Sequence, residues 1–108
     1  MTSLLKSGNL FDDVGTHTTG EDFLTLFENA GTRIDRIVSR SHSSPPGLWY
    51  DQAEDEWVMV LRGSATLEFA GGKVIEMQQG DYLLIPRGVR HRVARTGEPT
   101  IWLAVHLK

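Results

Sequence analysis

Cysteine is absent from the chain, and so are long apolar runs. Without cysteine there are no disulfides and no thiolate ligands for a metal ion. No stretch approaches the roughly 20 apolar residues that a membrane-spanning helix needs. The segment from Met1 to Gly8 also lacks the apolar core of a signal peptide. We therefore expect a cytoplasmic protein with no membrane partner.

Positive charge is also in short supply. Eleven basic residues stand against 14 acidic residues, which gives a net charge of −3 and argues against nucleic acid as a partner. A chain of 108 residues buries roughly two-thirds of its unfolded surface, so covering an exposed strand edge would add useful stability. We expect a homodimer whose other partner is a small-molecule ligand.

The first part of the chain predicts an arm followed by a helix. Three apolar residues follow helical spacing: Phe23, Leu26 and Phe27. Thr18 or Thr19 is a suitable N-cap for this helix, and Gly31 is a suitable stop. We therefore expect residues 1–31 to form an N-terminal arm and one short helix that pack on a barrel formed by residues 32–108.

Beyond Thr32 the pattern changes to alternation with a period of two. Seven or eight short segments with this period follow one another, nearly all separated by turns of hairpin length. Strands of this length and spacing are typical of an antiparallel barrel or sandwich. The sequence predicts an all-β domain, and in its first strand the mixed composition of both faces leaves the inner face undecided.

The second half of the chain contains a strand, a tight turn and another strand. In the turn, Pro86 fixes its own φ and Gly88 tolerates a positive φ. His91 then begins the next strand, where it shares a face with Val93 and Arg95 because successive side chains alternate. A histidine on the same face as a valine is predicted to point inward.

This stretch resembles the second cupin motif. The motif is a glycine, five residues, a proline, one residue, a glycine, two residues and a histidine, and its positions are matched by Gly80, Pro86, Gly88 and His91. Upstream, Gly47, Glu56 and Gly63 match the first cupin motif, including the six-residue gap before its last glycine. The resemblance covers residues 32–107. It implies a double-stranded β-helix, the cupin or jelly-roll barrel, in a small single-domain cupin.

The first motif departs from the family pattern at its His-x-His pair. Counting back from Glu56 places Gln52 and Tyr50 at the two histidine positions, or Asp51 and Trp49 under an alternative spacing. Neither alignment contains a histidine. In the second motif, Arg95 replaces the final asparagine.

The family binds a divalent metal through three imidazoles and a carboxylate. Here the resemblance carries over only His91 and Glu56 as ligands, with Gln52 or Asp51 as additional oxygen donors. Such a set favours harder ions such as Mn²⁺ or Mg²⁺ over Cu²⁺, and the candidate ions are Mn²⁺, Fe²⁺, Zn²⁺ and Ni²⁺. A metal-free site, in which Glu56 orients His91 for acid–base catalysis, is the open alternative.

Four further residues are candidates for binding a substrate. Tyr50 and Gln52 stand at the vacated histidine positions, so we expect both to face the cavity and to bond the ligand. Arg95 shares the His91 face, and Arg36 lies on the first strand of the barrel. If Arg95 or Arg36 enters the cavity, it would bind a carboxylate or a phosphate and select an anionic substrate.

Two other histidines are expected to lie outside the site. His106 alternates with Trp102, opposite an aliphatic set that includes Ile101. Because the aliphatic set is the better core, we expect His106 to be exposed. The loop that carries His42 leads to the first motif and is a candidate cover for the cavity mouth.

Two functions fit these features. The first is a small cupin enzyme that transfers protons on a polar or anionic metabolite, as an isomerase or epimerase of sugar phosphates would, with Glu56 and His91 as catalytic groups. Small cupins that resemble phosphomannose isomerase provide the precedent. The alternative is a non-catalytic module that binds or senses a small ligand. Metal analysis and thermal shift with divalent ions would help to separate them.

Overall fold

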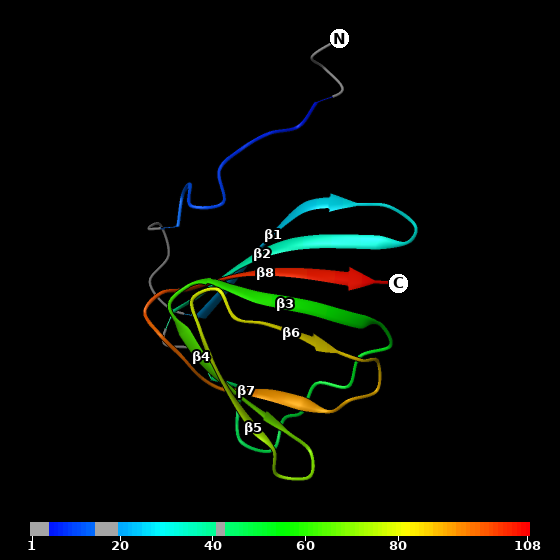
Figure 1. The fold of residues 1–108 in the computed structure, drawn as a ribbon, viewed down its shortest axis with the longest axis vertical. Helices are drawn as coiled ribbons and strands as arrows, with labels where there is room; N and C mark the ends of the chain where they lie inside the picture. Colours follow the sequence, from blue (N-terminus) through cyan, green and yellow to red (C-terminus); the bar gives the residue numbers. More distant parts are fainter. Residues whose placement is uncertain (1–4, 15–19, 41–42) are drawn as a thin grey trace.

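The computed structural model describes residues 5–14, 20–40 and 43–108, which contain eight β-strands in two antiparallel sheets. The strands are β1 Gly20–Glu28, β2 Thr32–Arg40, β3 Asp55–Arg62, β4 Ser64–Phe69, β5 Val74–Gln78, β6 Tyr82–Ile85, β7 His91–Thr96 and β8 Thr100–Leu107. One sheet has the order β1-β2-β8-β3-β6, and the other has the order β5-β4-β7. Figure 1 shows the larger sheet above the smaller one. The predicted all-β class is confirmed.

The prediction of an N-terminal helix is wrong, because this part of the chain forms β1. Strand β1 pairs with β2 and contains a bulge between Thr25 and Phe27. Leu26 is the extra residue, and it interrupts the alternation so that the apolar spacing imitates a helix. Pairing with β2 satisfies backbone groups that a helix would otherwise pair internally. The expected caps, Thr18 and Thr19, lie outside the described residues.

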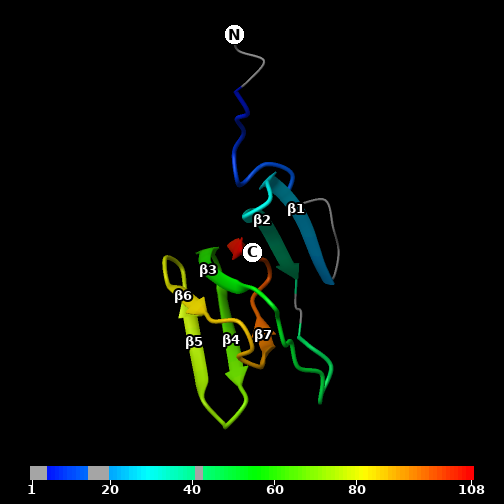
Figure 2. The ribbon, with the colours of Figure 1, turned by 90° about the vertical axis from the view of Figure 1, so that its right-hand side faces the viewer.

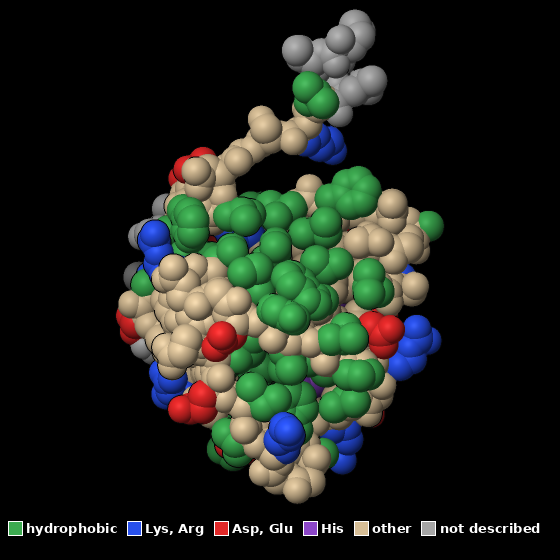
Figure 3. All heavy atoms as spheres, in the orientation of Figure 1, with side chains coloured by type: hydrophobic (Ala, Val, Ile, Leu, Met, Phe, Trp, Pro, Cys, Tyr) green, Lys and Arg blue, Asp and Glu red, His purple; other side chains and the backbone are tan. Residues whose placement is uncertain are grey.

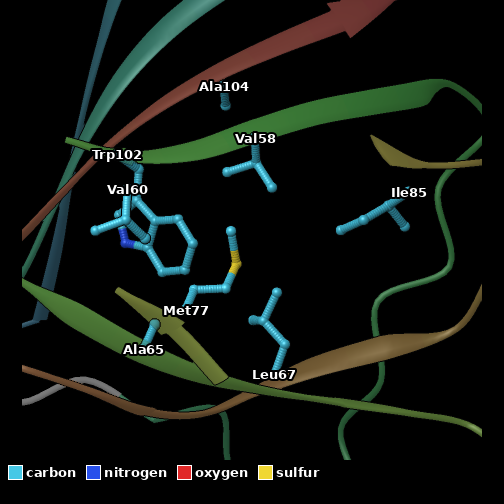
Figure 4. Packing of buried hydrophobic residues seen from close by; sticks show 8 residues of the cluster. All are labelled: Val58, Val60, Ala65, Leu67, Met77, Ile85, Trp102 and Ala104. Atoms are coloured by element: carbon cyan, nitrogen blue, oxygen red, sulfur yellow. The ribbon is translucent and has the colours of Figure 1, made fainter. Parts of the chain in front are cut away.

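The hydrophobic core fills the space between the two sheets. Figure 4 shows its side chains pointing toward one another from both layers. The buried cluster consists of Val58, Val60, Ala65, Leu67, Met77, Ile85, Trp102 and Ala104. Burying a side chain of this kind contributes about 1.5–3 kcal/mol. The alternation that places Val58 and Val60 inside also turns Glu56, two residues earlier, toward the interior.

The junction between β3 and β4 depends on Gly63. Its φ is +92°, and a Cβ atom at this position would lie 2.6 Å from the carbonyl oxygen of Pro99 and 2.9 Å from Oγ1 of Thr100. Glycine therefore serves two purposes, the backbone conformation and the close approach of the turn before β8.

The described part of the N-terminal arm, residues 5–14, is tied to the outer face of the larger sheet. Arg36 is buried and donates hydrogen bonds to the backbone carbonyls of Leu10 and Asp12. The guanidinium of Arg62 lies 4.5 Å from the centre of the Phe11 ring, a cation–π contact. Figure 2 shows the arm leaving the barrel next to β1 and β2.

Hydrophobic side chains gather on the outer face of the larger sheet, over β3 and β6 (Figure 3). Tyr82 and Leu84 of β6 are 69% and 54% exposed, and the Tyr82 ring stacks on Trp57 of β3 with centroids 5.8 Å apart. At the sheet edge, β1 exposes Leu24 and Phe27. Within the described ranges, no helix could cross a lipid bilayer.

Candidate functional site

A cavity of about 240 Å³ lies between the sheets. Its apolar wall includes Val58, Leu67, Ile85 and Trp102, which belong to the core described above. Its polar lining consists of three carboxylates, one guanidinium, one amide, one phenol and two imidazoles. The cavity therefore combines a hydrophobic wall with an unusual concentration of ionisable groups.

His91 enters this cavity from β7, as the sequence predicts. The side chain is 5% exposed, and its Nδ1 lies 3.0 Å from the carbonyl oxygen of Val89. A carbonyl only accepts hydrogen bonds, so Nδ1 carries the proton of this bond and Nε2 of the neutral ring has a free lone pair. The backbones of His91 and Tyr50 exchange two hydrogen bonds, of 3.1 and 2.7 Å, and hold the ring in place.

Glu56 lines the cavity from the opposite sheet, on β3. Its Oε1 accepts a hydrogen bond of 2.7 Å from Nε2 of Gln52. The glutamine at a histidine position of the first motif therefore presents its amide N–H to the carboxylate. Gln52 and Glu56 both line the cavity, and Tyr50 lines it as well with 38% of its surface exposed.

The expectation that His106 is exposed is wrong. Its side chain is 8% exposed and lines the cavity. Nε2 lies 3.8 Å from Oδ2 of Asp35 and 3.9 Å from Oε2 of Glu56, and Nδ1 lies 3.8 Å from Oε1 of Glu54. The reason is register: His106 pairs with Glu56 across β3 and with Arg33 across β2, and directly opposed residues share a face.

Asp35 is held in the cavity wall by β1 and β2. Its Oδ2 accepts a 3.0 Å bond from Nε of Arg33, and its Oδ1 accepts a 2.9 Å bond from Oγ1 of Thr25. The carboxyl is buried, so these donors offset its desolvation. The Arg33 guanidinium that lines the cavity is thus already engaged in an ion pair.

Glu21 brings the third cavity carboxylate from β1. Its Oε2 accepts a 2.9 Å bond from Oγ of Ser39, whose oxygen in turn accepts a 3.1 Å bond from the indole N–H of Trp102. Ser39 is fully buried. The chain of donors fixes one end of the cavity wall.

The two arginines proposed as anion ligands lie elsewhere. Arg36 occupies the outer face and bonds the arm. Arg95 is exposed and lies 3.4 Å from Oγ of Ser64. In the ladder, Arg95 pairs with Thr66 but Val93 pairs with Leu67, so a bulge at Ala94 breaks the alternation and turns Arg95 away from the face of His91.

Of the remaining residues that the sequence suggested, Asp51 lies outside the cavity and Gln52 lies in it. Asp51 is exposed and is not part of the cavity lining, so of the two alternatives only Gln52 stands beside Glu56. His42 lies outside the described residues. Sequence reasoning missed Glu21, Arg33, Asp35 and His106. The signal that finds Arg33, Asp35 and His106 is the alternation of β2 and β8 once Trp102 is known to face inward. Glu21 follows from its pairing with Ser39 across β1 and β2.

The described residues do not fit the metal site that the cupin fold implies. No group of three or more His, Asp or Glu side chains among them is arranged to hold an ion. The chemistry of the donors also argues against a metal ion. The amide N–H of Gln52 donates a hydrogen bond to Glu56, and no imidazole lies at the histidine positions of the first motif. A bound metal stays a prediction.

Comparisons with known proteins place this geometry in a family. The family model for the cupin domain matches residues 41–106. A crystal structure from Ralstonia eutropha JMP134, named a putative mannose-6-phosphate isomerase, is 50% identical over 96% of this chain and 99% of that chain, with a TM-score of 0.91. No curated protein gives a significant match.

More distant structures share the fold. A cupin superfamily protein from Desulfitobacterium hafniense DCB-2 is 16% identical over 99% of this chain and 86% of its own, with a TM-score of 0.73. A protein containing a cupin-2 domain from Shewanella frigidimarina NCIMB 400 is 19% identical over 93% of both chains, with a TM-score of 0.74. With its cavity, its surviving motif residues and these matches, the chain belongs to the cupin family, as a small single-domain cupin.

Proposed function

We propose that the protein is an enzyme that transfers a proton on a polar sugar-like metabolite within the cupin cavity, as an isomerase or epimerase does. The observation that carries the proposal is the 3.0 Å contact between Nδ1 of His91 and the carbonyl oxygen of Val89. Because Nδ1 is committed to the carbonyl of Val89, the neutral ring offers Nε2 to the cavity as a general base. The 50% identity to a protein named for an isomerase activity supports the same reaction class.

The reaction balances without an oxidant or a second substrate. His91 Nε2 removes the proton from the carbon next to a carbonyl, and the electron pair moves to the carbonyl oxygen, which gives an enediol once that oxygen is protonated. Return of a proton to the neighbouring carbon gives the isomer, and return to the opposite face of the same carbon gives the epimer. Glu56, oriented by Gln52 at 2.7 Å, moves the proton between the two oxygens.

The cavity wall supplies the other requirements. Tyr50 and Gln52 offer hydrogen-bond donors to the hydroxyl groups of a sugar. The Trp102 ring and the aliphatic side chains of the core form an apolar surface against which C–H groups pack. The buried position of His91 keeps bulk water away from an enediol.

Proton exchange in D₂O tests this proposal without knowledge of the product. The protein would be incubated with mannose, fructose and mannose 6-phosphate, and loss of the C–H signals next to the carbonyl would be followed by proton NMR. We expect exchange with the wild-type protein and a loss of about 10²–10⁴-fold in His91→Asn, as removal of a general base predicts. An unchanged rate in His91→Asn, or no exchange with any sugar, would contradict the proposal.

The alternative function is binding without catalysis, and the Gln52–Glu56 hydrogen bond favours it. That bond occupies one carboxylate oxygen, and the vacated histidine positions leave a cavity with few metal donors. Metal analysis of the purified protein and thermal shift with Mn²⁺, Fe²⁺, Ni²⁺ and Zn²⁺ address this alternative, since an ion that binds the folded state stabilises it. Ligand binding with no proton exchange and no metal-dependent shift would support the binding module.

A further inference from the structure

The charges that line the cavity are predominantly negative. Among the described residues, Glu21, Asp35 and Glu56 face it, and the one guanidinium in the lining, on Arg33, is paired with Asp35 at 3.0 Å. Three carboxylates against one guanidinium give the lining an acidic excess. Among the described residues that line the cavity, no cation is left to receive a phosphate.

Three polar atoms converge at one point of this lining without bonding one another. They are Nε2 of His106, Oδ2 of Asp35 and Oε2 of Glu56, and two sides of their triangle measure 3.8 and 3.9 Å. Both distances exceed those of hydrogen bonds. The His106 side chain is 8% exposed, and its other nitrogen, Nδ1, is buried without a hydrogen-bond partner. Nδ1 lies 3.8 Å from Oε1 of Glu54, outside the triangle. The atom that the ring offers to a ligand in the triangle is therefore Nε2, with two carboxylate oxygens beside it.

The chemistry of the three atoms indicates which ligand fits. A metal ion is not supported, because no group of His, Asp and Glu side chains among the described residues is arranged to hold one. An ammonium nitrogen forms bonds of about 2.8 Å to carboxylates, and its three N–H groups match two carboxylate oxygens and one imidazole lone pair.

We propose that the cavity binds a small molecule through a primary ammonium group held by Asp35, Glu56 and His106, and that it rejects phosphorylated sugars. The inference rests on the proposed function only in regarding that molecule as a substrate. The apolar wall of Val58, Ile85 and Trp102 then contacts the carbon skeleton. An amino sugar contains both the ammonium group and the carbon skeleton.

Titration of the full chain followed by NMR of the backbone amides tests the proposal. Glucosamine, glucose and glucose 6-phosphate share one skeleton and differ in charge, and ethanolamine carries the ammonium alone. We expect glucosamine to bind with a Kd at least tenfold lower than glucose, ethanolamine to shift the same cavity amides, and glucose 6-phosphate to shift none of them. Added salt should weaken the binding of both amines.

A pair of isosteric variants separates the effect of a charge in the cavity from the effect of the net charge of the protein. Glu56→Gln should raise the Kd of glucosamine at least tenfold, and by a larger factor than it changes the Kd of glucose. Glu76→Gln removes the same charge from an exposed position on β5, where the side chain accepts a bond from Thr66, and should leave both unchanged. Thermal unfolding would establish that both variants are folded.

The outcomes distinguish this inference from the proposed function. Cavity shifts with glucose 6-phosphate at the affinity of glucosamine, equal effects of Glu56→Gln and Glu76→Gln, or no shifts with either amine would overturn the ammonium site. Glucosamine binding without any proton exchange supports the site and contradicts catalysis. Proton exchange on neutral sugars, with no tighter binding of glucosamine than of glucose, contradicts the ammonium site and leaves the proposed function standing.

Discussion

The cavity combines residues that the sequence identifies with residues that only the fold brings in. The inward positions of His91 and Glu56 follow from alternation with their valine neighbours, and both were predicted. His106 was missed because both faces of β8 are buried in part. The aliphatic set on the other face is the more apolar of the two, and its member Ile101 is itself fully buried. Composition alone does not rank two such faces. Arg95 was misplaced for another reason, a bulge that alternation does not anticipate.

The hydrogen bond from Gln52 to Glu56 predicts a loss of stability in a variant that lacks it. Gln52→Ala removes the 2.7 Å donor of a mostly buried carboxylate, so we expect the free energy of unfolding to fall by about 1–2 kcal/mol. Urea unfolding followed by fluorescence measures it. The control is Gln79→Ala, at an exposed position in the turn before β6. Equal losses in the two variants would contradict the role given to Gln52.

Strands were the most predictable elements of this protein. From β2 onward, each alternating segment of the sequence became a strand, and glycine or proline marks most of the turns. The exception is β1, where the bulge at Leu26 shifts the alternation and the apolar residues fall at helical spacing. Only pairing with β2 decides between the two structures, and that pairing is a tertiary contact which local pattern does not contain.

The turn between β3 and β4 is predicted not to tolerate a side chain at Gly63. Gly63→Ala places a Cβ atom against Pro99 and Thr100 in addition to straining a positive φ. Gly72→Ala has a similar φ of +99° with no atom within 4 Å of the new Cβ, so it isolates the strain, which costs about 1–3 kcal/mol. We expect Gly63→Ala to lose more stability than Gly72→Ala in thermal unfolding. Equal losses would show that the close approach carries no cost.

The whole molecule has more sheet on one side of its core than on the other. Five strands face three. Within the described residues, β1 ends the larger sheet with one edge unpaired and with exposed apolar side chains, Leu24 and Phe27 among them. Unprotected edges of this kind pair with other chains unless they are covered. We propose a second copy of this chain as the cover, which is the homodimer expected from the size of the domain.

Light scattering coupled to size exclusion tests this assembly. We expect twice the mass of the chain at micromolar concentration and above, and a shift toward the monomer in Phe27→Lys. Val74→Lys, on β5 in the smaller sheet and 55% exposed, is the matched control and should keep the dimer. A monomeric wild-type protein, or equal dissociation in both variants, would contradict the assignment of β1 to the interface.

The extra residue at Ala94 affects the cavity as well as the geometry of β7. On a regular ladder the same sequence would turn Arg95 toward the ligand and Thr96 away from it, and the pocket would offer a guanidinium to an anion. A one-residue slip in the pairing of β7 with β4 therefore decides whether the cavity contains this guanidinium. Loss of the slip would change the charge of the cavity with no charged residue substituted, and a residue-by-residue comparison of sequences would not reveal the change.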